Sequence, residues 1–212
     1  MSDSLDESQA GSSPAPATET RKRPKPGERR MQILQALASM LEKPGSERVT
    51  TAALAAQLQV SEAALYRHFA SKAQMFEGLI DFIEQTVFTL INQVVEREGD
   101  GIAKAARVVA LTLQFGERNP GMARVMVGDA LVHENERLQQ RMNHFFDRIE
   151  LSLRQVLREA AAVQQSSTPT VEAQVRASVL TAFTVGRLQR FCRSGFKKSP
   201  SETLDQALSL MS

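Results

Sequence analysis

The sequence predicts an all-α protein in which a small three-helix unit containing a helix-turn-helix precedes a larger helical unit. Apolar residues recur at intervals of three and four positions along most of the chain, which is the period of an amphipathic helix. Residues 50–72, TTAALAAQLQVSEAALYRHFASK, contain two short helical patterns on either side of a tight turn, the spacing of a helix-turn-helix. Together these two patterns indicate an all-helical fold with its helix-turn-helix near the N-terminus.

Positive charge is concentrated on the helix-turn-helix region. Residues 1–20 hold four acids and no bases, residues 21–72 hold ten bases and four acids, and the remaining 16 bases and 16 acids cancel. Binding to phosphates requires such a concentration of cations. A solvated basic face would have the same composition, so charge alone leaves both interpretations open.

The composition bounds the class of protein. With 212 residues, of which 42% are apolar, the chain can bury a full core and is expected to be soluble and globular. It contains no run of about 18 apolar residues, and its start is polar, so we expect neither a membrane span nor a signal peptide. Cys192 is the only cysteine, which excludes an internal disulfide and favours a cytoplasmic location.

Residues 1–24 are expected to form a disordered tail that is acidic first and then basic. The first 20 residues are rich in Ser, Ala, Pro and acids and show no periodicity. The basic segment RKRPKPGERR follows at residues 21–30, and its prolines oppose a helix until about Pro26. Such an arm can lie along phosphates or enter a minor groove, or it can serve only to keep the chain soluble.

The first helix is expected over residues 28–41 and covers the helix-turn-helix from behind. Pro44-Gly45 ends it. This helix completes the three-helix core that a small helix-turn-helix domain needs, so we expect residues 25–72 to form one domain. Its apolar positions lie three and four apart: Met31, Ile33, Leu34, Leu37, Ala38 and Leu41.

The helix-turn-helix follows with recognisable caps. Thr50 or Thr51 caps its first helix, and the other hydroxyl is available for a phosphate. Ser61 caps the second helix, and Glu62 favours the positive end of that helix. Gln59 occupies the turn, where a non-glycine residue at positive φ costs about 1 kcal/mol.

The second helix is predicted to read a DNA groove, because small residues let it approach closely and polar groups follow them. Phe69 is expected to pack in the three-helix core, whereas Tyr66 can either pack there or reach a phosphate. We assign one group of side chains to phosphates: Thr50, Thr51, Tyr66, His68 and Lys72. A second group is expected near the groove: Ser61, Glu62, Ala63 and Arg67.

A long helix is expected to start after Ser71 and to run to about Arg97, with Gln74 as the partner in a capping box. Phe82 and Phe88 lie off its apolar stripe. Either this helix is buried on several sides, or part of its flank is a binding surface. The stripe itself contains Phe76, Leu79, Ile80, Ile83, Val87, Leu90, Ile91 and Val94.

Five more helices are predicted in the remainder of residues 73–212. Asn119 is expected to cap the second of them and Pro120 to start it. QQSSTPT, residues 164–170, is expected to be a loop, and Ser199-Pro200-Ser201-Glu202 has the form of a capping box before the last helix. Leu138, Met142, Phe145, Ile149, Leu153 and Val156 form a core stripe. The expected ranges are 102–117, 120–127, 134–162 and 171–193, followed by a last helix that contains Leu204, Leu208 and Met211.

The sequence also resembles the TetR-type regulators. The resemblance is carried by a Thr-capped helix, a short helix after a Ser cap, and LYRHFASK at residues 65–72; it departs at Gln59, where those proteins usually have Gly. It implies a homodimer in which the last two long helices pair as a four-helix bundle and present two reading units to a pseudo-palindromic site. Ser178, Ala182 and Gly186 form a small-residue row that would permit such packing, although an ordinary intrachain core is the alternative.

The sequence resembles one branch of that family, the nucleoid occlusion factors, more closely than the others. The matching segments lie in both units: VSEAALYRHFASK at 60–72, FIE at 82–84, FGERNPG at 115–121, RIE at 148–150 and LRQVLRE at 153–159. The resemblance implies a dimer or higher assembly on DNA, located on the nucleoid, that binds the tail of the division GTPase FtsZ. A tail with apolar and charged residues needs a groove of the same chemistry. We expect it between the helices over 72–97 and 102–117, at Phe82, Leu111, Arg118 and Asn119.

No catalytic, metal or cofactor site is predicted, so an enzyme is not expected. His133-Glu134 lacks the second His of a zinc-protease helix, and no Gly-rich phosphate loop is present. His144 is expected at the surface or core edge, and Cys192 is expected to be buried and inert. The competing hypothesis is a transcriptional repressor released by an apolar small molecule held among the helices expected over residues 72–97, 102–117, 120–127 and 134–162.

Overall fold

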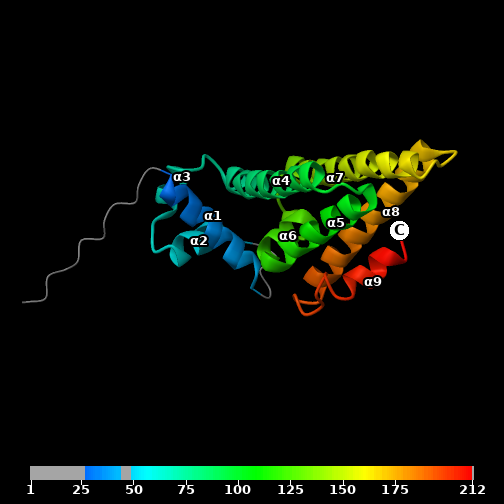
Figure 1. The fold of residues 1–212 in the computed structure, drawn as a ribbon. Coiled ribbons are helices and arrows are strands. Elements are labelled where there is room, and N and C mark those ends of the chain that lie inside the picture. The colour runs from blue at the N-terminus through cyan, green and yellow to red at the C-terminus, as the bar shows by residue number, and fades with distance from the viewer. Residues whose placement is uncertain (1–26, 44–48, 212) are drawn as a thin grey trace, which may run out of the picture.

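The computed structural model describes residues 27–43 and 49–211 and confirms the all-α fold within them. Three short helices gather at one end of the molecule, and the long helices α4, α7 and α8 extend away from them (Figure 1). The predicted tail over residues 1–24 lies before the described residues. The elements are α1 (Glu28–Leu41), α2 (Thr51–Gln57), α3 (Glu62–Tyr66), α4 (Lys72–Arg97), α5 (Gly101–Arg118), α6 (Pro120–Met126), the short 3₁₀ helix η1 (Asp129–Leu131), α7 (Glu136–Val163), α8 (Pro169–Arg193) and α9 (Leu204–Ser209).

Side-chain caps begin several helices where the sequence predicts them. The open choice at the start of α2 is resolved, because the Ala53 N–H donates to the Thr50 hydroxyl at 3.1 Å. The Ser61 hydroxyl accepts from Ala64 N–H at 3.3 Å at α3, and Asp100 caps α5. Each cap satisfies a backbone donor that the helix leaves without an internal partner.

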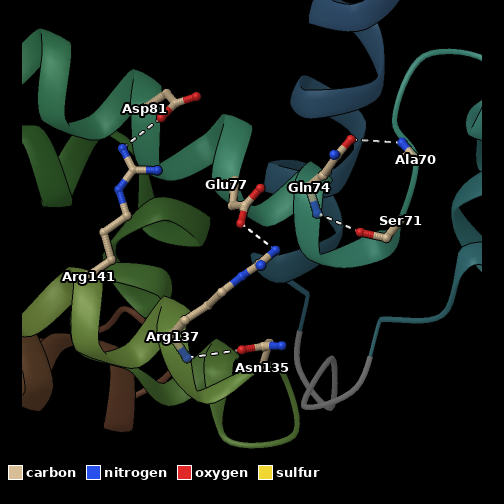
Figure 2. Close-up of polar contacts among 8 residues, drawn as sticks. All are labelled: Ala70, Ser71, Gln74, Glu77, Asp81, Asn135, Arg137 and Arg141. Carbon is tan, nitrogen blue, oxygen red and sulfur yellow. Dashed lines mark hydrogen bonds and ion pairs between the residues drawn. The ribbon is translucent and has the colours of Figure 1, made fainter.

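Several predicted helix ends are wrong in detail. At α4 the Gln74 side chain accepts from the N–H of Ala70, one residue before the cap, although the cap itself is Ser71 as expected (Figure 2). At α6 the Asn119 side chain does not cap; its amide donates instead to the Phe115 carbonyl at 2.8 Å and closes the end of α5. Both side chains bond to a backbone group other than the one that sequence spacing suggested.

The expected capping box before the last helix does not form. The Ser199 hydroxyl donates to the Glu117 carboxylate on α5, and α9 begins only at Leu204, after Thr203 in the left-handed region at φ 52°. Glu202 lies in the turn, where its carbonyl accepts from Arg187. The remaining differences are small: α5 starts one residue early, α7 starts at Glu136 because Asn135 caps it, and α8 starts at Pro169 inside the expected loop.

The core forms where α4, α5, α7 and α8 meet. The six residues of the predicted α7 stripe are all buried. Phe88 is half-buried, with its ring centroid 5.4 Å from that of Phe145 and the Arg148 guanidinium 3.8 Å above its ring. Leu90 is 38% exposed, so its place in the α4 core stripe is wrong. One flank of α4 is therefore buried beyond the stripe, and another faces solvent.

The helix-turn-helix unit is joined to the rest of the chain through α1. A Cβ atom added to Gly121 on α6 would lie 2.1 Å from the Ala38 carbonyl oxygen, so the two backbones approach as closely as glycine permits. Arg124 on α6 donates to the Leu41 carbonyl at 3.2 Å and pairs with Asp129 at 2.6 Å. The last turn of α1 is thus tied to α6 by packing and by hydrogen bonds.

The outer face of α8 has few contacts within the described chain. Val171, Val175 and Val179 are 63%, 57% and 48% exposed. The small residues Ser178, Ala182 and Gly186 are exposed beside them, and a Cβ atom added to Gly186 would meet no described atom within 4 Å. An apolar stripe with room for a close neighbour is the surface that a partner helix would cover.

Candidate nucleic-acid interface

The recognition helix α3 and the residues just after it are held by two buried side chains and present most of the others to solvent. Leu65 is fully buried and Phe69 is 1% exposed, which confirms the core position predicted for Phe69. Tyr66 is 45% exposed, and Arg67 and His68 are exposed beside it. The side chains assigned to DNA on this helix therefore point away from the core.

Arg30 on α1 fixes the end of α3. Its guanidinium lies 4.1 Å above the Phe69 ring and donates to the His68 carbonyl at 3.0 Å. The turn before α3 contains Gln59 at φ 54°, the positive value expected from its place in the motif. The Val60 N–H still reaches the Ala55 carbonyl at 3.0 Å, so the turn keeps its hydrogen bonds without a glycine.

The hydroxyl groups assigned to the interface already have hydrogen-bond partners within the chain. Thr50 and Ser61 cap α2 and α3, as described above. Thr51 donates to a Glu62 carboxylate oxygen at 2.6 Å and so links the start of α2 to the start of α3. Ala63 is exposed next to Glu62 and leaves the face of α3 open.

Lys72 lies at the start of α4 and already has an anionic partner. Its ammonium pairs with Glu134, in the segment before α7, and lies 5.7 Å from the centre of the Phe76 ring. The Lys72 side chain is 26% exposed and that of Glu134 only 10%. Sequence reasoning missed this ion pair because its members are 62 positions apart.

If Lys72 neutralises a DNA phosphate, Lys72→Ala will weaken binding by a similar factor on every duplex. It will also reduce the slope of log K against log salt by about 0.9. Lys104→Ala is the matched control, because Lys104 lies on α5 with Glu159 4.0 Å away. Titrations of one duplex over a series of salt concentrations measure both quantities. An unchanged slope in Lys72→Ala would assign Lys72 to the Glu134 ion pair alone.

Ion pairs continue along α4 from Lys72 and join it to α7. Arg137 pairs with Glu77 at 2.6 Å, and Arg141 pairs with Asp81 at 2.6 Å (Figure 2). Arg141 also pairs with Glu84 at 2.7 Å. These acceptors, Glu84 first, raise the pKa of the Arg141 guanidinium, so it stays charged. Acids at intervals of three and four on α4 and arginines four apart on α7 are the sequence signal that would have found this contact.

The side chains assigned to a partner groove lie on α4 and α5 but are only partly brought together. Phe82 is 36% exposed, Arg118 is exposed, and Leu111 is 9% exposed. A hollow of about 220 Å³ lies between the two helices, and Leu111 lines it. Phe82, Arg118 and Asn119 lie outside the hollow. Its other lining residues include Leu90, Val94, Arg97 and Arg107.

The described residues outside this interface contain neither a reactive cysteine nor a group of metal ligands. Burial raises the pKa of the Cys192 thiol to about 12, which keeps it protonated and unreactive. Among residues 27–43 and 49–211, no three His, Cys, Asp or Glu side chains are grouped so that they could hold a metal ion. No helix in those ranges is both long enough and apolar enough to cross a membrane.

The fold and the exposed α3 define a DNA-binding protein with a helix-turn-helix of the TetR type. The family model described as bacterial regulatory proteins, tetR family, matches residues 33–79. The model described as SlmA-like, tetracyclin repressor-like C-terminal domain matches residues 99–212. A TetR-family transcriptional regulator from Bordetella parapertussis 12822 has the same fold, with a TM-score of 0.68 at 16% identity, covering 87% of this chain and 94% of that one.

Two curated relatives are similar along almost their whole length. The nucleoid occlusion factor SlmA of Vibrio vulnificus (strain YJ016) is 50% identical over 189 residues, which are 89% of this chain and 96% of that protein. The SlmA of Photobacterium profundum is 52% identical over 185 residues, 87% of this chain and 94% of that protein. The chain belongs to the family of the nucleoid occlusion factor SlmA.

Proposed function

We propose that this protein binds specific chromosomal sites and, from there, binds FtsZ and blocks assembly of the division ring over the nucleoid. The single observation that carries the proposal is the 50% identity to a nucleoid occlusion factor over 89% of the chain, which includes both matched domains. In this proposal, residues 25–72 read DNA, and residues 73–212 form the dimer and bind the partner. The site of action is the cytoplasm at the chromosome.

Symmetry supports binding to pseudo-palindromic DNA. The exposed stripe on α8 is apolar and carries a row of small residues, which suits pairing with the same stripe of a second copy. Two copies related by a two-fold axis would present two α3 helices to two half-sites. A dimer, or a pair of dimers on one site, is the assembly that we propose.

The surface between α4 and α5 supports binding of an FtsZ tail. Leu90 and Leu111 line the hollow there, and Phe82 is exposed on the same α4 helix, so apolar anchors are available to an extended peptide. Arg97 and Arg107 line the same hollow and supply cations for the acidic groups of a tail. We propose that Arg118 and Asn119 extend this surface at the end of α5.

Sedimentation of FtsZ polymers with GTP tests the function. The protein is added alone and then with a duplex selected by it from random DNA. DNA-dependent loss of polymer, or co-sedimentation with FtsZ, is the expected result. If the polymers are indifferent under both conditions while the duplex is bound tightly, the FtsZ part of the proposal is wrong and the DNA part stands.

The groove predicts the behaviour of two variants. Phe82→Ala and Arg118→Glu should each weaken binding of an FtsZ tail peptide by about tenfold or more, because an apolar anchor or a cation is lost. Matched controls are Val132→Ala and Lys197→Glu, which change an exposed apolar side chain and an exposed cation elsewhere. Fluorescence anisotropy of a labelled peptide measures the affinities. Full-strength binding by folded Phe82→Ala and Arg118→Glu would place the groove elsewhere.

The hollow in the apolar core is too small to support the alternative of a repressor released by an apolar ligand. The apolar hollow among α5, α7, α8 and α9, lined by Ile102, Leu157, Leu180 and Leu208, has a volume of about 20 Å³. A ligand pocket needs about 300–1,000 Å³. Side chains of the chain itself fill this part of the core.

A further inference from the structure

The hydrogen bond between Thr51 and Glu62 occupies the hydroxyl that the sequence assigns to a phosphate contact. A threonine hydroxyl has one proton to donate. In the structure that proton goes to the Glu62 carboxylate at 2.6 Å, the length of a charge-assisted bond. The hydroxyl of Thr51 therefore has no proton left for a phosphate oxygen.

Capping does not explain the Thr51 hydroxyl either. Thr50 is the N-terminal cap of α2, because its hydroxyl accepts from the Ala53 N–H. Thr51 is half-buried at the first position of α2, whereas Glu62 is exposed at the first position of α3. The half-buried hydroxyl thus holds an exposed carboxylate in one orientation.

Glu62 lies at the start of the recognition helix, so the orientation of its carboxylate affects which base the helix can contact. Residues at the start of a recognition helix are the ones that approach base edges in the major groove. A carboxylate there is repelled by phosphates, and the base-edge partner that suits it is the N4 amino group of cytosine, which donates a hydrogen bond. With one carboxylate oxygen held by Thr51, the other is directed and free to accept.

We infer that Glu62 selects cytosine in each half-site and that Thr51 is the positioning residue that aims its carboxylate. The inference rests on the proposed binding of specific DNA and adds the identity of one base and the pair of residues that read it. Thr51 acts through Glu62 and contacts neither base nor phosphate.

Selection from random duplexes with the full-length chain tests the inference. The wild-type protein should enrich a two-fold site with cytosine at one symmetric pair of positions. Glu62→Gln should move that preference to adenine, because an amide pairs with the adenine edge. Thr51→Val keeps the shape of the side chain and removes the hydroxyl, and it should lower discrimination for cytosine by about fivefold or more. Thr51→Ser should keep the wild-type preference.

Affinity on matched duplexes separates positioning from a phosphate contact. Thr51→Val should bind the cytosine duplex more weakly but bind a duplex changed at that pair as the wild type does, with an unchanged salt slope. Combined with Glu62→Gln, it should cause no further loss of discrimination. Melting curves must show that each variant is folded, and Thr51→Ser provides a second measurement if Thr51→Val is not.

Three results would overturn the inference. Equal weakening of Thr51→Val on all duplexes, with a lower salt slope, would return Thr51 to the phosphate contacts. An unchanged preference in Glu62→Gln would remove Glu62 from base reading. Failure of the wild-type protein to enrich any site would instead refute specific DNA binding itself, and this result is distinct because it appears before any variant is made.

Discussion

Replacing Gly121 with alanine is expected to lower the free energy of unfolding by about 3 kcal/mol, at the upper end for an overpacked site. The new methyl carbon would lie 2.1 Å from the Ala38 carbonyl oxygen and 3.0 Å from its carbon. Both are backbone atoms of α1, so no side chain can rotate out of the way. Because α1 covers the helix-turn-helix, its displacement should also weaken DNA binding.

Thermal and urea unfolding of Gly121→Ala measure this effect. Gly99→Ala is the matched control, since a Cβ atom added to Gly99 meets no described atom within 4 Å. We expect the control to melt at nearly the same temperature as the wild type. If Gly121→Ala is as stable as Gly99→Ala, α1 and α6 are not in close contact in solution.

Val175→Glu should prevent dimerisation and reduce affinity for a two-fold DNA site by about 100-fold or more. Val175 is 57% exposed in the middle of the α8 stripe. In a dimer paired through this stripe, two glutamates would be buried close to the two-fold axis, and an unpaired buried charge costs about 3–5 kcal/mol. A monomer could engage only one half-site.

Sedimentation equilibrium and DNA titration together test this prediction. Val132→Glu places the same charge on a side chain that is 70% exposed after η1, and it should stay dimeric and bind DNA normally. A Val175→Glu protein that remains a dimer at micromolar concentration would show that another surface joins the two copies.

Local chemistry made much of the fold predictable from the sequence. The stripe from Leu138 to Val156 keeps one period throughout, so both the presence of α7 and its buried face follow from the pattern. Ser61, Ser71 and Pro120 each mark a helix start through a preference that depends on neighbouring residues alone.

The wrong sequence predictions lie where the contacts of a side chain depend on the folded structure. The Asn119 side chain could cap α6 or close α5, and only the folded structure shows that it donates to the Phe115 carbonyl and does not cap α6. Ser199 meets Glu117 because α5 passes beside the last turn, which no local spacing reveals. Leu90 fits the α4 stripe, yet the neighbouring helices leave it uncovered.

At the candidate site, too, the sequence pattern predicts which side chains are exposed but not their tertiary partners. Exposure of Arg67 and His68 follows from the helix-turn-helix pattern, because Leu65 and Phe69 must face the core, whereas the pattern leaves open whether Tyr66 is buried. The partners of Thr51 and Lys72 do not follow from it. Each belongs to another helix or to the segment before one, so its role depends on tertiary contacts that sequence spacing does not contain.

The state of Cys192 makes the native chain convenient for spectroscopy. It is the one cysteine in 212 residues; its thiol is buried, which raises its pKa to about 12, so we expect it to react slowly with maleimide dyes at neutral pH. A second cysteine placed at an exposed position such as Val132 should therefore take up a fluorophore selectively in the otherwise unaltered protein. Energy transfer between two such labels would report on the distance between the two Val132 positions of a dimer, with and without DNA.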